Sequence, residues 1–169
     1  MFFSGWTTFG SISSTGRIQG GIILINIFFG PIANVAFGVA LQINNAFTAL
    51  TNSMVLPFRP AMIKAYAEAR FDYVNQLFSV SNKFIIYILS AVSIPIAMEM
   101  KSVLIIWLGY INSNILLFSQ LIIVYIVSMA MHNPITIIIH ATGHIKEYHL
   151  PVESITLLCL PLTWVLLVS

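Results

Sequence analysis

The chain has 169 residues, of which 59% are apolar and 7% are charged, and its formal net charge is +2. A water-soluble domain usually carries about 25% charged residues, so this composition excludes a soluble globular domain. The seven Lys and Arg residues are scattered along the chain, which excludes the basic surface that nucleic-acid binding requires. We therefore expect an all-α integral membrane protein with the lipid bilayer as a partner.

The first two predicted transmembrane spans are residues 2–30 and 32–57. The first contains one charged residue, Arg17, and at about 1.5 Å per residue it is long enough to cross a ~30 Å hydrocarbon layer. Pro31 follows Gly30 and suits a tight turn or the first position of a new helix. The second span carries no charge.

Residues 58–80 differ from the spans because charged and aromatic side chains alternate along them, as is typical of an amphipathic helix at a membrane surface. The third predicted span is residues 77–98. Its helix has to begin before Lys83, because only 15 uncharged residues separate Lys83 from Glu99. The lysine amine can extend to the lipid headgroups.

The fourth and fifth predicted spans are residues 115–140 and 150–169. Pro134 lies inside the fourth span and removes one backbone hydrogen bond, which a neighbouring helix or water must replace. The final apolar run is too short to cross a bilayer fully, so we expect the chain to be a truncated piece of a longer protein. We treat residues 1–169 as one transmembrane helical domain of five spans.

The distribution of Lys and Arg predicts the orientation of the chain. Residues 57–83 hold four of the seven basic residues, and residues 141–150 hold Lys146. Basic loops stay on the cytoplasmic side, so both segments and the amino terminus are expected there.

Arg17 is the most informative residue, because an arginine inside a span costs roughly 2.5–3.5 kcal/mol and persists only beside a partner or a wet cavity. We expect Arg17 and Gln19 to face such a cavity. The alternative is an arginine bonded to backbone carbonyls within a helix bundle. Gly16 and Gly20 have the four-residue spacing that lets a second helix approach closely.

The second span has one face of polar and small side chains at steps of three and four residues: Asn34, Gly38, Gln42, Asn45, Ala49 and Asn52. We expect this face to point into protein or water. Gln42 and Asn45 suit sugar hydroxyls, because an amide both donates and accepts hydrogen bonds. The same amides can instead hold helices together.

Residues that would indicate an enzyme or a metal site are sparse. The sequence has no paired carboxylates within a span, no nucleophile with a base and no phosphate-binding glycine loop. His140, His144 and His149 allow a metal site by spacing, but we expect ordinary loop histidines. The lone Cys159 is expected to pack as a small apolar side chain. We predict no enzymatic activity, no cofactor and no metal.

Four blocks of the sequence carry a resemblance: GWTTFGSISSTGRIQGGIILINIFFGP, ANVAFGVALQINNAF, RPAMIKAYAEARFDYVNQLFSVSNKF and HATGHIKEYHLP. In order and spacing they resemble the second half of bacterial polysaccharide flippases. These belong to the multidrug/oligosaccharidyl-lipid/polysaccharide exporter superfamily. The resemblance extends over essentially the whole chain.

The resemblance implies that the chain corresponds to helices seven to eleven of a transporter built from two six-helix bundles, whose remaining half is a partner. It also implies multi-pass residence in the bacterial inner (plasma) membrane. The implied substrate is a polyprenyl-pyrophosphate-linked oligosaccharide, moved outward for O-antigen, lipopolysaccharide or capsule biosynthesis. Arg17 begins a segment, Arg17-Ile18-Gln19-Gly20, that matches the family's Arg-x-Gln-Gly motif.

Three alternatives stay open at this point. A multidrug or organic-cation antiporter of the same fold would require an acidic residue within the membrane, and residues 2–30 and 32–57 contain none. A membrane-embedded glycan-assembly enzyme would need acid and base groups near the bilayer surface, where Glu99 and Glu153 are isolated candidates. The third alternative is that the chain is a non-functional remnant of a broken gene or an incomplete sequence.

Overall fold

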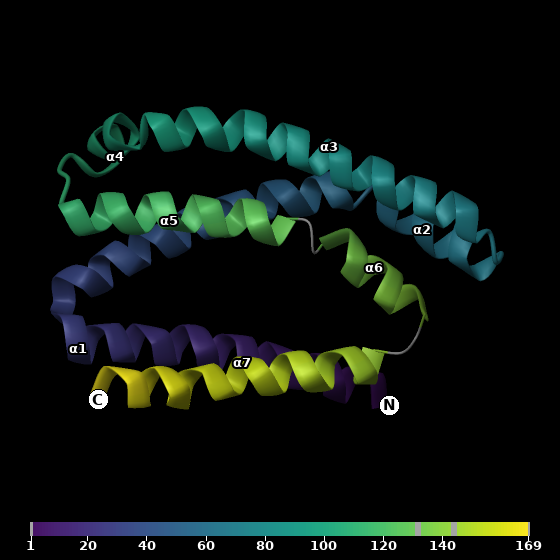
Figure 1. The fold of residues 1–169 in the computed structure, drawn as a ribbon, viewed down its shortest axis with the longest axis horizontal. Coiled ribbons are helices and arrows are strands. Elements are labelled where there is room, and N and C mark those ends of the chain that lie inside the picture. The colour runs from purple at the N-terminus through teal and green to yellow at the C-terminus, as the bar shows by residue number, and fades with distance from the viewer. Residues whose placement is uncertain (1, 131–132, 143–144, 169) are drawn as a thin grey trace. The chain divides into compact units, whose positions relative to one another are not determined.

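The computed structural model describes the backbone of residues 2–130, 133–142 and 145–168, and the side chains of 12–130, 134–139, 151–152, 154–155 and 158–168. All elements in these ranges are helices (Figure 1): α1 (Phe2–Val55), α2 (Phe58–Ala67), α3 (Phe71–Met98), α4 (Met100–Leu108), α5 (Ser113–Ala130), α6 (Asn133–Thr142) and α7 (Ile145–Val168). The predicted all-α class is confirmed for these residues. The chain divides into two compact units, unit 1 (Met1–Asn34 and Gly143–Ser169) and unit 2 (Val35–Thr142).

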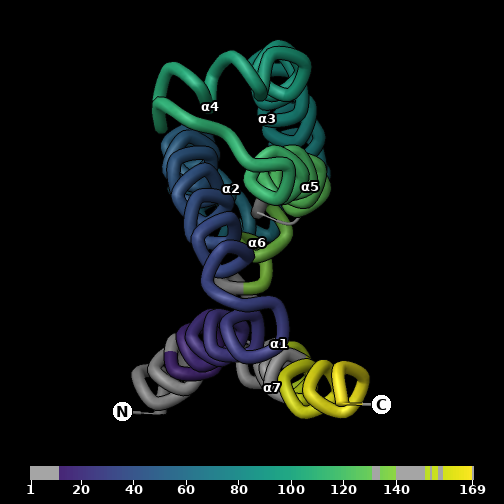
Figure 2. The backbone as a smooth tube through the Cα atoms, turned by 90° about the vertical axis from the view of Figure 1, so that its left-hand side faces the viewer, coloured from purple at the N-terminus to yellow at the C-terminus, as the bar shows by residue number. Residues whose placement is uncertain are grey.

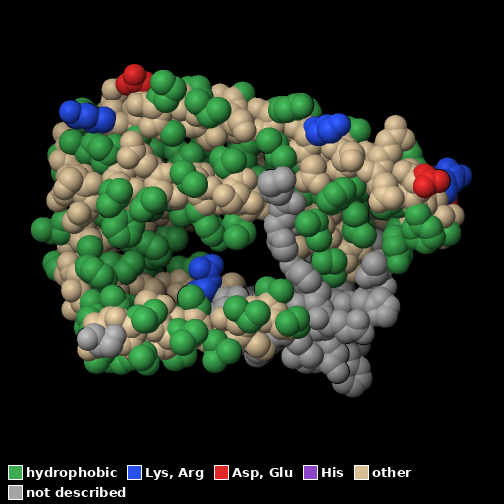
Figure 3. All heavy atoms as spheres, in the orientation of Figure 1, with side chains coloured by type: hydrophobic (Ala, Val, Ile, Leu, Met, Phe, Trp, Pro, Cys, Tyr) green, Lys and Arg blue, Asp and Glu red, His purple; other side chains and the backbone are tan. Residues whose placement is uncertain are grey.

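Three helical segments are long and apolar enough to cross a membrane: Ile12–Val55, Phe71–Met98 and Ser113–Ile139. A shorter apolar helix covers Leu158–Val168. Many large apolar side chains are exposed, up to 86% for Ile106. On the face drawn in Figure 3, hydrophobic side chains cover much of the surface and charged ones are few. Lipid is the solvent that suits such a surface, which supports the membrane class.

The long helix α1 is interrupted at a single residue, Gly30, whose backbone angles are φ 79° and ψ 179°. This combination is essentially restricted to glycine, because a Cβ would clash with the backbone. Pro31 then starts the following turn, where its missing N–H costs no helical hydrogen bond. The predicted boundary between residues 2–30 and 32–57 therefore coincides with the one non-helical residue of α1.

In unit 2, α3 and α5 pack side by side (Figures 1 and 2). Each helix presents a buried stripe in which small serines interrupt larger apolar residues. On α3 the stripe is Val74, Ser81, Ile85, Leu89 and Ser93, and on α5 it is Ile115, Ser119, Ile123, Ile126 and Ala130. Small side chains at such a contact let two membrane helices approach closely.

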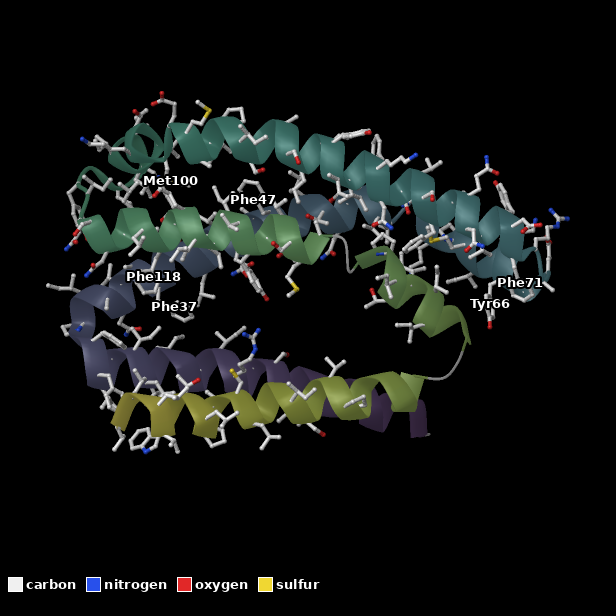
Figure 4. All side chains as sticks on the ribbon, viewed as in Figure 1. Phe37, Phe47, Tyr66, Phe71, Met100 and Phe118 are labelled. Carbon is white, nitrogen blue, oxygen red and sulfur yellow. The ribbon has the colours of Figure 1, made fainter. Side chains whose placement is uncertain are left out.

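The second part of α1 completes the core of unit 2. Phe47 and Val55 join one apolar cluster with residues of α2, α3, α5 and α6. Ala36 and Val39 join another with Met100, Leu104, Ile115 and Ile123 of α4 and α5. An edge-on ring pair, Phe37 with Phe118 at 6.5 Å between centroids, adds a contact between α1 and α5 (Figure 4). Residues 35–55 are therefore fixed by packing on several sides.

The predicted surface segment, residues 58–80, forms α2 and the first part of α3. In α2, Met62 and Ala65 are buried, whereas Arg59 and Lys64 are exposed, so the helix has one apolar and one charged face. The apolar face packs against α3 and α6. Its placement at the cytoplasmic membrane surface stays a prediction.

A tight turn connects α2 to α3. Ala69 adopts a left-handed conformation with φ 56°, which is uncommon for a residue with a side chain. Two contacts surround it: the rings of Tyr66 and Phe71 lie edge-on at 5.8 Å (Figure 4), and the Arg70 Nε lies 3.1 Å from the Glu68 carboxylate. Both charged side chains are exposed, and an exposed ion pair contributes little stability. We therefore attribute the stability of the turn mainly to the contact between the two rings.

The predicted fourth span, residues 115–140, corresponds to two helices. α5 ends at Ala130 and α6 begins at Asn133, so Pro134 is the second residue of α6. Residues 131 and 132, which lie between the two helices, are outside the described residues, so the predicted effect of Pro134 on the helix stays a prediction. Pro134 itself is fully buried.

In unit 1, the first part of α1 and α7 lie side by side and run in the same direction (Figures 1 and 2). The rings of Phe28 and Trp164 meet edge-on with centroids 5.5 Å apart. Leu160, Pro161 and Trp164 line a shallow apolar depression together with Gly20, Ile23 and Leu24. The contact is therefore almost entirely apolar.

Candidate functional site

Arg17 lies on the stripe of α1 that faces α7. Ser13, Arg17, Gly20 and Leu24 follow each other at steps of four, three and four residues, so they share one side of the helix. Ser13 and Leu24 are buried, with 1% and 8% of their surfaces exposed. Arg17 itself is exposed in unit 1. The guanidinium of Arg17 therefore extends beyond the buried side chains that share its side of α1.

At Gly20 the backbone of α1 lies close to α7. A Cβ added to Gly20 would lie 2.7 Å from a methyl carbon of Leu160, closer than real Cβ atoms come. At Gly16, by contrast, an added Cβ would meet no described atom within 4 Å. Of the two glycines, Gly20 therefore allows the close contact with α7, and Gly16 has no comparable contact among the described residues.

The charge on Arg17 has no partner in the part of the chain that the structure describes. α1 contains no acidic residue, and the single ion pair among the described side chains joins Arg70 to Glu68. No hydrogen bond from the guanidinium to a described residue is found either. In a span, such a cation needs an anion, water or carbonyl oxygens around it.

Gln19 does not share the surface of Arg17. Two residues along a continuous helix correspond to a rotation of about 200°, so the two side chains leave α1 on nearly opposite sides. Both are exposed in unit 1. We therefore assign Arg17 and Gln19 to different surfaces of α1.

Gln42 and Asn45 lie in unit 2, three residues apart on one side of α1, and both are exposed. Gln42 borders a cavity of about 330 Å³ whose other lining residues are apolar: Ile43, Ala46, Phe47, Ile96, Met100, Val103, Leu104 and Trp107. Asn45 is not among them. The surroundings of Gln42 suit a hydrocarbon chain better than a sugar.

A polar pocket of about 200 Å³ lies between α1 and α5 and was not found by the sequence analysis. α1 supplies Asn44, Thr48 and Thr51, and α5 supplies Tyr125 with Ile126, Met129 and Ala130. Asn44, Thr48 and Thr51 follow at steps of four and three residues, which was the signal available in the sequence. The neighbouring stripe, with Gln42 and Asn45, was predicted to bind the sugar instead.

The remaining candidate residues add no site. The side chains of His140, His144, His149 and Glu153 lie outside the described residues, and the described side chains contain no cluster of three metal-ligating groups. The hydroxyl of Ser102 donates a hydrogen bond of 3.0 Å to the Glu99 carboxylate.

Cys159 of α7 is exposed rather than packed as the sequence analysis expected. Its backbone carbonyl accepts a 2.7 Å hydrogen bond from the hydroxyl of Thr163, one turn later. Exposure within the apolar run Leu158–Val168 suits a thiol solvated by lipid or by another helix.

Comparison of the chain with protein-family models, with curated proteins and with solved structures finds no match. A function has to be inferred from the residues and their geometry, together with the resemblance described above.

Proposed function

We propose that the chain is part of a membrane transporter that flips a polyprenyl-pyrophosphate-linked oligosaccharide across the bacterial inner membrane for surface polysaccharide biosynthesis. One observation carries the proposal: Arg17 is the only charged residue of the 54-residue helix α1 and is exposed there without a partner among the described residues. The sequence resemblance supports the same function.

The proposed architecture has five membrane spans, and the three long apolar segments correspond to the first four of them. Residues 2–30 and 32–57 are the first two, separated at Gly30, where α1 leaves helical geometry. The last span is residues 150–169, which includes the short apolar helix Leu158–Val168. The remaining half of the transporter completes the transport path.

The negative charge of the proposed substrate explains why a cation such as Arg17 is needed. A pyrophosphate is anionic, and a planar guanidinium forms two parallel charge-assisted hydrogen bonds to phosphate oxygens. In a low-dielectric site this pairing is much stronger than in water. The first two proposed spans, residues 2–30 and 32–57, contain no acidic residue that could bind an organic cation, which favours flippase activity over drug antiport.

A competing role for Arg17 is to hold α1 against α7. Gly20 contacts Leu160 and the helices are parallel, so Arg17 lies at the level of residue 157 of α7. Pro161 has no N–H, so the carbonyl of residue 157 lacks its usual helical donor. A guanidinium that donated to this carbonyl would stabilise the helix pair instead of binding substrate.

The test is export of lipid-linked oligosaccharide to the outer leaflet in cells that lack their own flippase and express the transporter at matched levels. The variants are Arg17→Ala, Arg17→Lys, and Arg17→Ala combined with Pro161→Ala. The proposed role predicts loss of export with Ala, partial rescue with Lys, and no rescue by Pro161→Ala.

Rescue of export when Pro161→Ala is added to Arg17→Ala would assign Arg17 to the helix contact. Alanine at position 161 has a backbone N–H, so it would donate to the carbonyl of residue 157 in place of the guanidinium. Unchanged export in Arg17→Ala would remove Arg17 from the transport mechanism. Absence of export by the unmodified protein would refute the proposed function itself.

A further inference from the structure

The polar pocket between α1 and α5 lies within two apolar segments that are long enough to span a membrane. Tyr125 is near the middle of Ser113–Ile139, and Asn44 and Thr48 lie inside Ile12–Val55. At this depth hydrocarbon offers no hydrogen bonds, so polar side chains there require water, protein or a polar ligand.

Three of the four polar side chains in the pocket have hydrogen-bonding capacity left. Thr51 is 2% exposed, and its hydroxyl donates to the backbone carbonyl of Phe47 at 2.8 Å. Asn44, Thr48 and Tyr125 make no hydrogen bond to other residues in the described part of the chain, and Tyr125 keeps 43% of its surface exposed. The amide of Asn44, the hydroxyl of Thr48 and the phenol of Tyr125 therefore line one pocket, and each can still donate hydrogen bonds to a ligand and accept them from it.

The chemical character of this set selects its ligand. None of the lining residues is charged, so an ion would find no counter-charge in the pocket. An amide, a hydroxyl and a phenol each donate and accept, which matches a ligand whose own groups do both. Tyr125 adds an aromatic face, and Ile126 and Met129 add apolar contact. A neutral ring bearing several hydroxyl groups satisfies all of these features.

We infer that this pocket binds a sugar ring of the transported glycan, with Asn44 and Thr48 bonding its hydroxyl groups and Tyr125 lying against its face. The inference rests on the proposed function and assigns the sugar to residues other than Gln42 and Asn45. It separates recognition of the glycan, in unit 2, from recognition of the pyrophosphate by Arg17.

Binding to the purified chain in lipid nanodiscs tests the inference with two probes: bare polyprenyl pyrophosphate and the same carrier bearing an oligosaccharide. Thr48→Val and Tyr125→Phe each remove one hydroxyl and keep the shape of the side chain. We expect either change to lower the affinity for the glycosylated probe by about 3- to 10-fold, which is the effect of one lost hydrogen bond. The affinity for the bare probe should stay unchanged.

Ser53→Ala is the matched control, because Ser53 is an exposed hydroxyl on α1 whose 2.9 Å bond goes to the carbonyl of Ala49 and which lies outside the pocket. It should bind both probes like the unmodified chain. Equal affinity of Thr48→Val and the unmodified chain for the glycosylated probe would overturn the inference and leave a water-filled pocket. Equal weakening of both probes would also overturn it, whereas failure of both probes to bind the unmodified chain would refute the proposed function as well.

Discussion

Replacing Gly20 by alanine tests the helix contact that positions Arg17. Alanine is favoured over glycine in a helix by about 0.5–1 kcal/mol. At Gly20 part of this gain is offset, because the new Cβ would lie 2.7 Å from the end of the flexible Leu160 side chain, which must rotate away. We therefore expect Gly20→Ala to stabilise the chain less than alanine does at an open helical position.

Gly16→Ala is the matched control, since it lies one turn earlier on α1 and its Cβ would meet no described atom within 4 Å. It should be neutral or stabilising by up to ~1 kcal/mol. The assay is unfolding of the purified chain in mixed detergent micelles, followed by circular dichroism, with all variants measured in the same lipid-to-detergent ratio.

The clash is with the end of a flexible side chain, so removing that side chain should relieve it. Leu160→Ala alone creates a gap, but in combination with Gly20→Ala it should cost less than the two single changes added together. Equal stabilisation by Gly20→Ala and Gly16→Ala would refute the close contact between α1 and α7. Additive effects in the double variant would refute the role of Leu160.

Other predictions address the kink and the buried hydroxyls. Gly30→Ala should destabilise the chain by about 1–3 kcal/mol, because alanine is strained at φ 79°, whereas Gly38→Ala in open, helical surroundings should not; the same unfolding assay compares them. Ser119→Ala should raise stability by about 1 kcal/mol, since its buried hydroxyl has no partner among the described residues. Ser81→Ala is the contrast, because the Ser81 hydroxyl already donates to the Phe78 carbonyl at 3.0 Å; a larger gain for Ser81→Ala than for Ser119→Ala would contradict this reasoning.

Local chemistry explains which parts of the fold were predictable. The break in α1 follows from Gly30 and Pro31, whose backbone preferences act within a few residues. The apolar composition alone indicates helices in lipid, because only a helix or a closed barrel satisfies every backbone hydrogen bond there.

The candidate site was harder to predict because two polar stripes run along the same part of α1. Gln42 and Asn45 form one, and Asn44, Thr48 and Thr51 form the other, displaced by about 120° around the helix. Periodicity cannot decide which stripe meets a neighbouring helix. The choice depends on where Tyr125 of α5 lies, which is set by packing between segments distant in the sequence.

The most direct test of the account is the affinity of the chain in nanodiscs for polyprenyl pyrophosphate, compared with that for the uncharged polyprenyl alcohol. Charge-assisted hydrogen bonds contribute about 1.5–3 kcal/mol each, so the pyrophosphate should bind at least about tenfold more tightly. Arg17→Ala should abolish that preference, and Arg17→Lys should retain part of it. Equal affinity for both lipids, or a preference that survives Arg17→Ala, would contradict the assignment of Arg17 as the residue that binds the pyrophosphate.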